Sequence, residues 1–221
     1  MRILQTTALI ALACIAAAQD TEKLNLTRQF KEGSVHKYKI AVQVEDGQGL
    51  DLKGTLEAKD GKSDKDGKSQ VDFKVSDFSM TGGGGDGTAP APAKHLIDKQ
   101  NMPETISVDG DGPIFIVLAL SSYLPGKELV KGESFNIDWK GKDGGGTITG
   151  KGSITEIKTD NGIKIAVVKS TMQVTPSNQP DAAEIEVVSE FNLADGTLIK
   201  STGKGNIPNG GKLTFNLALV K

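Results

Sequence analysis

The chain has 221 residues, a formal net charge of −2, and only 5% aromatic residues. Its lysines are scattered among the acidic residues, which argues against a nucleic-acid-binding protein, because that class usually carries a basic stripe or patch. Cys14 is the one cysteine. If the amino terminus is removed as predicted below, disulfides, thiol catalysis and cysteine-ligated metals are excluded together.

The first eighteen residues have the pattern of an export signal. Arg2 supplies a positive start, Ile3 to Ile15 are mostly apolar, and Ala16-Ala17-Ala18 is the small-residue pattern that a signal peptidase requires. We predict a signal peptide over 1–18 and an exported protein, periplasmic or extracellular. The apolar stretch is shorter than the ~20 residues that cross a bilayer, so we expect no transmembrane helix after cleavage.

A second interpretation of the same segment is lipid anchoring. Cys14 follows Ala11-Leu12-Ala13, which loosely resembles the lipobox of bacterial lipoproteins. The leucine lies one place too close to the cysteine for that pattern, so cleavage before Gln19 is preferred.

The next part of the chain alternates apolar and polar residues with a period of two, which predicts strands with one buried face. Strands are expected over 36–44, 50–59 and 70–80. The apolar parity of the third strand switches between Val75 and Phe78, which predicts a bulge near Ser76-Asp77.

Two segments interrupt the alternation. Residues 82–94 are rich in Gly, Ala and Pro, too poor in large side chains to pack a core, and are predicted to be a flexible loop. Residues 113–124 form an apolar run that begins with Pro113 and stops before Pro125-Gly126. A helix fits these boundaries best, and a buried strand is the competing interpretation.

The second half returns to alternating strands, separated by turn signals such as Asp160-Asn161-Gly162 and Asp195-Gly196. The expected strands cover 135–139, 146–158, 163–174, 184–193, 197–205 and 212–220. We therefore predict a mainly β protein, an antiparallel meander forming a curved sheet, half-barrel or sandwich with one short helix near 113–124. A single domain over 19–221 is expected.

The two halves on either side of the Gly-rich loop share some detail. Residues 54–59 before an Asp-Gly turn match residues 152–158 before the turn at Asp160, with one extra residue. An ancient duplication explains this match, and so does the general likeness of alternating strands to one another.

The stretch Leu124-Pro125-Gly126-Lys127-Glu128-Leu129-Val130-Lys131-Gly132-Glu133-Ser134-Phe135 resembles an LPxKxVxxGDxW-like pattern of uncharacterised secreted bacterial β-rich families. Here the spacing is shifted by one at Leu129, and Glu133 and Phe135 replace the Asp and Trp. The resemblance implies a helix before the stretch and the second half of the sheet after it, and no activity. The order of elements also resembles the half-open barrels of periplasmic lipoprotein carriers.

Signatures of metal or nucleotide binding fail on spacing. The chain has two histidines: His36 falls at the start of a strand, and His95 is expected in a loop contact or beside Asp98, so a zinc site is not expected. An EF-hand frame on Asp64 and Asp66 puts Lys62 and Phe73 at the first and twelfth positions, which excludes that motif and favours a turn. The two Gly-Lys-Ser sequences lack the upstream glycine of a phosphate loop.

Signatures of catalysis fail as well. Ser201 and Lys204 have the spacing of a serine–lysine pair but lie in an alternating strand rather than at a helix start, so the spacing is attributed to chance. No cofactor, metal or catalytic residue is predicted, and an enzyme is the least favoured class.

The function predicted from the sequence is a non-catalytic binding module for a hydrophobic ligand or a lipoprotein-like partner. Lipid, hydrophobic peptide and an envelope protein are the partners considered, and Phe115, Leu118 and Trp139 are expected to line the ligand site between the helix and the sheet. Trp139 shares parity with Phe135 and Ile137, so core packing is favoured over a carbohydrate-stacking platform as the role of its ring. A structural or interaction component of the cell envelope is the alternative, and a hydrolase without a recognisable motif is the second alternative.

Overall fold

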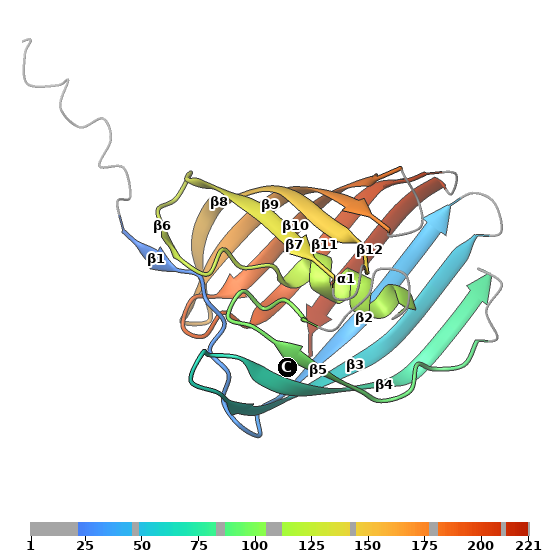
Figure 1. Cartoon of the computed structure of the whole chain (residues 1–221), viewed down its shortest axis with the longest axis horizontal. Helices are drawn as coiled ribbons and strands as arrows, with labels where there is room; N and C mark the ends of the chain where they lie inside the picture. The colour runs from blue at the N-terminus through green and yellow to red at the C-terminus, as the bar shows by residue number, and fades with distance from the viewer. Residues whose placement is uncertain are drawn as a thin grey trace, which may run out of the picture.

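The computed structural model describes residues 22–45, 49–82, 87–104, 112–141, 145–176, 181–208 and 211–220. The predicted signal peptide over 1–18, Cys14, and residues 83–86 of the predicted loop lie outside the described residues. The described part is built from antiparallel strands and one short helix (Figure 1). Its elements are β1 (Leu24–Asn25), β2 (Val35–Glu45), β3 (Leu50–Ser63), β4 (Ser69–Gly82), β5 (Ala93–Ile97), α1 (Gly112–Ser122), β6 (Glu128–Leu129), β7 (Ser134–Lys140), β8 (Thr147–Asp160), β9 (Ile163–Thr175), β10 (Ala183–Asn192), β11 (Leu198–Ile207) and β12 (Gly211–Leu219).

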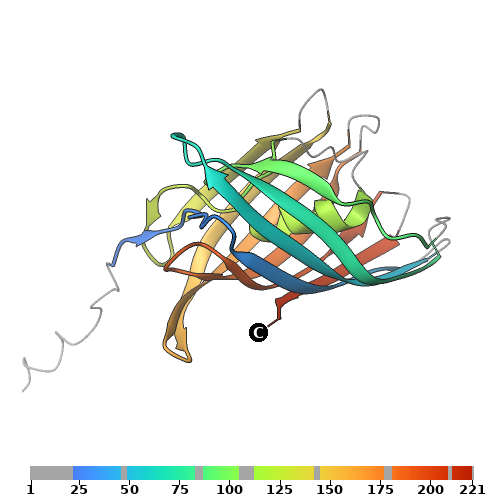
Figure 2. The same ribbon diagram turned by 90° about the horizontal axis from the view of Figure 1, so that it is seen from below.

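Ten of the strands form one antiparallel sheet in the order β5-β4-β3-β2-β12-β11-β10-β9-β8-β7. Two meanders, β2 to β5 and β7 to β12, meet where β12 pairs with β2, for example at Phe215 and Val42. The sheet is strongly curved but not closed, and β5 and β7 are its two edges (Figures 1 and 2). The predicted mainly β fold with a curved meander is confirmed. The duplication of the two halves stays a prediction.

The bulge predicted near Ser76-Asp77 is confirmed. Lys53 pairs with Ser79 and Thr55 pairs with Ser76, so that Asp77 and Phe78 lie opposite the single residue Gly54. Asp77 has a φ of 49°, a left-handed conformation that aspartate tolerates better than most residues. The bulge therefore moves the apolar parity from Val75 to Phe78.

The helix predicted over 113–124 is present as α1, over Gly112–Ser122, and the buried-strand alternative is wrong for this segment. Gly112 has a φ of 78°, which favours glycine at the start of the helix. The helix ends at Ser122, three residues before Pro125. Proline is common just after a helix because it cannot continue one. Among the residues that the structure describes, no helix has the length and apolar character needed to span a membrane.

The helix α1 lies inside the curve of the sheet, against β2, β10, β11 and β12 (Figures 1 and 2). In the sequence α1 lies between the two edge strands, β5 and β7. The concave face and α1 therefore share one hydrophobic core. Its largest fully buried side chains are Phe191, Leu26, Leu52, Leu56, Met102, Ile114, Leu120, Leu124, Leu129, Ile137 and Ile148.

A pocket and a serine chain beside the concave helix

A small pocket lies between α1 and the β2 to β5 half of the sheet. Its volume is about 40 Å³, which is room for roughly three water molecules at about 10–15 Å³ each. Its floor is apolar and its rim is polar. The lining residues are Arg28, Phe30, His36, Tyr38, Ala58, Asp60, Val71, Phe73, Ile97, Asn101, Pro103, Leu118, Ala119 and Ser122.

Three rings pack together where α1 meets β4 and β5. The ring centroids of Phe73 and Phe115 are 5.7 Å apart, and those of His95 and Phe115 are 5.1 Å apart. These edge-to-face distances are within the favourable range for aromatic pairs. His95 lies on β5 with 5% exposure, packed against apolar rings. Asp98, the neighbour considered for it, accepts instead from the backbone N–H groups of Gln100 and Met102.

The three residues expected to line a ligand site lie around α1 in different roles. Leu118 is half-buried and lines the pocket. Phe115 is buried in the ring cluster next to it. Trp139, on β7, donates its indole N–H to the carbonyl oxygen of Pro103 at 3.1 Å. It therefore ties Pro103, in the segment before α1, to an edge strand of the sheet, and Trp139 itself does not line the pocket.

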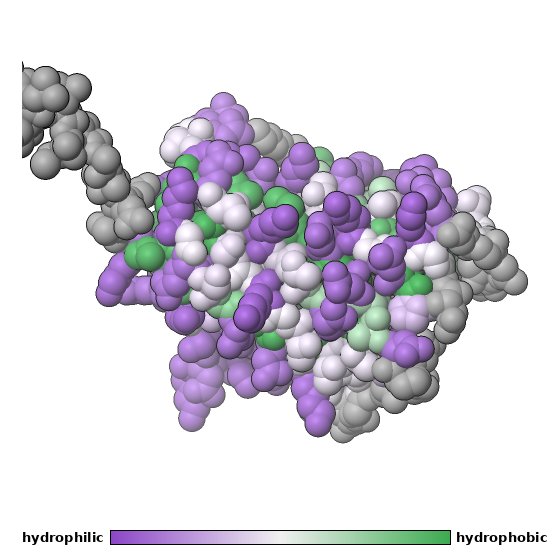
Figure 3. Space-filling model, turned by 90° about the horizontal axis from the view of Figure 1, so that it is seen from above, coloured by the Kyte–Doolittle hydropathy of each residue, from purple (hydrophilic) through white to green (hydrophobic). Residues whose placement is uncertain are grey.

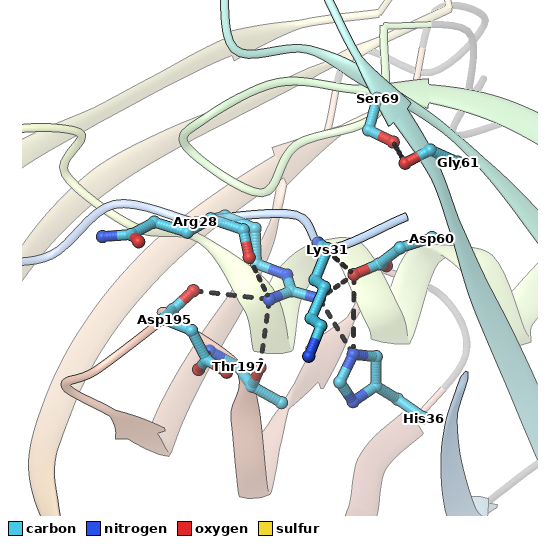
Figure 4. A network of polar contacts seen from close by, with 9 residues as sticks. Arg28, Lys31, His36, Asp60, Gly61, Ser69, Asp195 and Thr197 are labelled. Atoms are coloured by element: carbon cyan, nitrogen blue, oxygen red, sulfur yellow. Dashed lines mark hydrogen bonds and ion pairs between the residues drawn. The ribbon is translucent and has the colours of Figure 1, made fainter. Parts of the chain in front are cut away.

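A buried ion pair forms the polar rim of the pocket (Figure 4). Arg28 Nη2 donates to Asp60 Oδ2 at 2.8 Å, and both side chains are almost fully buried. Arg28 Nη2 lies 3.1 Å from His36 Nε2. The same His36 nitrogen lies 3.6 Å from Asp60 Oδ2. Arg28 Nη1 also donates to Thr197 Oγ1 at 3.0 Å.

This rim is electrically balanced, since one buried cation faces one buried carboxylate. Tyr38 lies in the pocket wall beside it. Burial raises the pKa of the Tyr38 hydroxyl above its ordinary value of 10.0, and the Arg28 charge opposes that rise. Tyr38 is therefore neutral at physiological pH. The rim is suited to hydrogen bonding and offers no unpaired charge to a ligand.

The segment around Arg28 holds both connections of α1. Before the helix, Arg28 N–H donates to the Lys99 carbonyl at 2.8 Å. After the helix, Gly126 N–H donates to the Leu26 carbonyl at 3.1 Å, and β1 pairs with β6. The two connections also bond to each other, Leu124 N–H to the Gln100 carbonyl at 2.8 Å. The segment around Arg28 therefore holds the chain on both sides of α1, at Lys99 before it and at Gly126 after it.

A chain of buried hydroxyls joins the end of α1 to the concave face. Ser189 Oγ, on β10, donates to the Ser121 carbonyl at 2.7 Å. Its other contact is Ser201 Oγ, on β11, at 3.0 Å. Because a hydroxyl has one proton, Ser201 is the donor of that pair. The last carbonyls of a helix have no hydrogen-bond donor within the helix. Ser189 supplies a donor to one of them, the carbonyl of Ser121.

Ser121 itself has a buried hydroxyl for which the described residues provide no hydrogen-bond partner. Sequence reasoning missed these serines as a group because Ser189 and Ser201 are ordinary residues of alternating strands. Ser201 was noted only for its spacing from Lys204. In the structure Lys204 is exposed and paired with Glu186, whereas Ser201 is fully buried, so the two do not form a catalytic pair.

Within the described ranges, no group of three or more His, Cys, Asp or Glu residues could hold a metal ion. Asp64 accepts from the backbone N–H groups of Asp66 and Lys68, at 2.8 and 2.9 Å, and so forms the hairpin turn that the sequence favoured. The sequence has another Asp-rich stretch, Asp109-Gly110-Asp111-Gly112, and both of its aspartates lie outside the described residues.

The molecular surface seen from above is mainly polar. In the view of Figure 3 the surface is covered mainly by hydrophilic and intermediate side chains, with small separate hydrophobic areas. Small scattered areas of this kind are ordinary on soluble proteins and do not mark a binding site. The side seen in this view therefore has no single large hydrophobic patch.

No family model and no curated protein matches this sequence. Among solved structures, the chain is similar to lipovitellin, in a structure titled for lipid–protein interactions, with 11% identity, a TM-score of 0.47, and coverage of 87% of this chain. The chain spans about a quarter (26%) of that lipovitellin chain. It is also similar to the hypothetical lipoprotein YmcC from Escherichia coli (K12), with 14% identity, a TM-score of 0.32, and coverage of 83% of this chain and 86% of that one.

The LPxKxVxxGDxW-like stretch gains no family from these comparisons. In the structure it begins at the end of α1, includes β6 and ends in β7, which is the placement that the resemblance implies. The functional case depends on the residues around α1.

Proposed function

We propose that this chain is an exported, non-catalytic binding module that holds an apolar ligand of the acyl-chain type on the concave face of its sheet, beneath α1. The observation that carries the proposal is the helix itself. Every residue of α1 from Ile114 to Leu120 is apolar, so the helix has no polar face to turn toward water. A helix that is apolar all round must be covered on all sides, and here it occupies the interior of an open sheet.

The size of the interior requires that α1 moves when a ligand binds. Ligand pockets generally have volumes of about 300–1,000 Å³, far above the volume of about 40 Å³ beside Leu118. A helix of eleven residues is about 16 Å long and about 10 Å wide. The ligand enters the space that α1 vacates as it moves outward.

The contact between α1 and the sheet is suited to such exchange. It is mainly apolar, so a second apolar group replaces it without leaving many polar groups unpaired. The buried hydroxyl of Ser121 lacks a partner among the described residues, and an unsatisfied buried hydroxyl costs about 1–3 kcal/mol. That cost disappears when the end of α1 reaches water.

In the bound state Leu118 and Phe115 contact the ligand from the helix side, because Leu118 lines the existing pocket and the Phe115 ring packs against Phe73 of the pocket wall. Trp139 contacts it at the β7 edge, where its bond to Pro103 marks the segment that moves with the helix. A lipid, a hydrophobic peptide, or the acyl group of a lipoprotein-like partner has the required apolar character.

The closely packed interior favours a second candidate, a structural or interaction component of the cell envelope. In that case the apolar residues of α1 only fill the core, and a partner binds to the outer surface or to an edge strand. The two candidates differ in whether loosening α1 opens a ligand site.

The test compares two truncations of fully buried leucines. Leu120→Ala weakens the packing of α1, and Leu52→Ala removes the same group from β3, on the sheet itself. Each change should cost about 2–5 kcal/mol of packing energy. Binding of palmitate to the full-length chain and to both variants is measured by native mass spectrometry and by titration calorimetry.

The proposal expects one palmitate per chain and a tighter apparent affinity for Leu120→Ala, because the binding-competent state becomes more populated. Leu52→Ala should not tighten binding. If no variant binds palmitate, or if both leucine variants change the affinity alike, the acyl-binding function is wrong and the interaction role is preferred.

A further inference from the structure

The serine chain at the end of α1 has a geometry that goes beyond helix capping. Ser201 donates to Ser189, and Ser189 donates to the Ser121 carbonyl, all on the concave face that α1 covers. Hydrogen bonds in series polarise one another, so the last donor of such a chain is stronger than an isolated hydroxyl. Ser189 Oγ is therefore a directed donor that points from the sheet toward the space occupied by α1.

Resting on the proposed function, we propose that Ser189 binds the carbonyl oxygen of an ester-linked or amide-linked acyl group, so that the ligand class is an acyl ester or amide rather than a plain hydrocarbon or ether. In the closed structure the Ser121 carbonyl occupies that acceptor position. When α1 moves outward, the Ser189 hydroxyl loses this partner while it stays surrounded by apolar side chains.

The need for a replacement follows from burial. Ser189 is 4% exposed and Ser201 is fully buried. Their cross-strand neighbours along the sheet include Val168 and Leu217, which are core residues. A hydroxyl covered by a hydrocarbon chain at this place would lack an acceptor, and an unmet donor in an apolar site is costly. A ligand with a carbonyl near its chain satisfies it.

The site is matched to a neutral acceptor. The described charged groups nearest to the pocket, Arg28 and Asp60, already satisfy each other, and the hydroxyl chain carries no net charge. An ester or amide carbonyl has the same chemistry as the peptide carbonyl of Ser121 that it would replace. In the closed structure the end of α1 therefore occupies the position of the ligand's carbonyl group, and the apolar residues of α1 occupy the position of its hydrocarbon chain.

The experiment uses two lipids that differ only in the carbonyl: monopalmitoylglycerol and its ether analogue hexadecylglycerol. Their affinities for the full-length chain are measured by titration calorimetry below the concentrations at which they aggregate. The variants are Ser189→Ala and Ser201→Ala. Ser69→Ala is the matched control, because Ser69 is also fully buried and donates to a backbone carbonyl, that of Gly61, on a different part of the sheet.

We expect the ester to bind about fivefold to tenfold more tightly than the ether to the unaltered chain, the effect of one hydrogen bond. In Ser189→Ala the ratio should fall to about one. The ether should bind that variant more tightly than it binds the unaltered chain, because the closed state has lost the hydrogen bond from Ser189 to the Ser121 carbonyl. Ser201→Ala should give an intermediate ratio, and Ser69→Ala should keep the original one.

The ratio separates this inference from the proposed function. Equal binding of both lipids to the unaltered chain, or a preference for the ester that survives in Ser189→Ala, overturns the role of Ser189 and leaves acyl binding standing. Binding of neither lipid overturns the proposed function as well. Circular dichroism of each variant confirms that the sheet is intact before its affinity is compared.

Discussion

Phe215 covers Gly203, its direct partner across β11 and β12. A β-carbon added at Gly203 would lie 2.1 Å from Phe215 Cζ. Phe135 covers Gly152 in the same way across β7 and β8, at 2.4 Å. In both pairs a ring fills the place of a missing side chain on the concave face, an arrangement that stabilises glycine within a strand.

Gly203→Ala should therefore lower the free energy of unfolding by about 1–3 kcal/mol, because the ring of Phe215 has to move in a packed core. Urea denaturation measures the change. Gly54→Ala is the control, since its β-carbon would meet Val75 Cγ1 at 3.4 Å, an ordinary contact. An equal loss of unfolding free energy in both variants would show that contact with the Phe215 ring is not the reason for glycine at position 203.

The buried ion pair of Arg28 and Asp60 should dominate the stability of the pocket rim. Asp60→Asn leaves the Arg28 charge buried without a counter-ion, which should cost about 3–5 kcal/mol. Asp72→Asn breaks the exposed pair with Lys94, 3.0 Å long, and should cost less than about 1 kcal/mol. Denaturant unfolding of both variants at neutral pH checks this, and a loss of similar size in the two would contradict it.

Asp98 should make the protein more stable in mild acid. Burial raises the pKa of this carboxyl above its usual value of 3.8, while the N–H groups of Met102 and Gln100 oppose the rise. A raised pKa in the folded state means that the protonated form is favoured by folding. Its contribution is therefore complete below pH 3.8 and is lost as the pH rises through the raised value.

The measurement is the difference in unfolding free energy between the unaltered chain and Asp98→Asn, followed from pH 7 to pH 4. Asparagine keeps the acceptor oxygen for both backbone bonds and cannot titrate in this range. We expect the variant to gain relative stability as the pH rises. A difference that stays constant with pH would show that Asp98 titrates normally.

Much of the sheet could be predicted from the sequence, because its strands bury one face and alternate over most of their length. The bulge at Asp77 was readable as a change of parity, and α1 was readable from its proline and glycine boundaries. The strand β5 was missed: Ala93 and Lys94, the last residues of the predicted loop, pair with Phe73 and Asp72 of β4. Five residues are too few for an alternating pattern to indicate a strand. These residues form a strand because they pair with β4.

The candidate site was harder to predict for the same reason. Leu118, which was expected to line a ligand site, lines the pocket, and its role in ligand binding stays a prediction. The pairing of Arg28 with Asp60, and of Ser189 with Ser201 and Ser121, depends on how distant strands are brought together. No local pattern encodes contacts between residues that are far apart in the chain.

The exchange of α1 for a ligand is tested most directly by hydrogen exchange of the backbone amides of the full-length chain, with and without saturating palmitate. A helix as short as α1 is marginally stable once it leaves a packed surface. We therefore predict that palmitate speeds exchange in α1 and slows it in β10 and β11, which the ligand then covers. If palmitate binds and the α1 amides exchange at an unchanged or slower rate, the ligand does not replace the helix, and the account of this site is wrong.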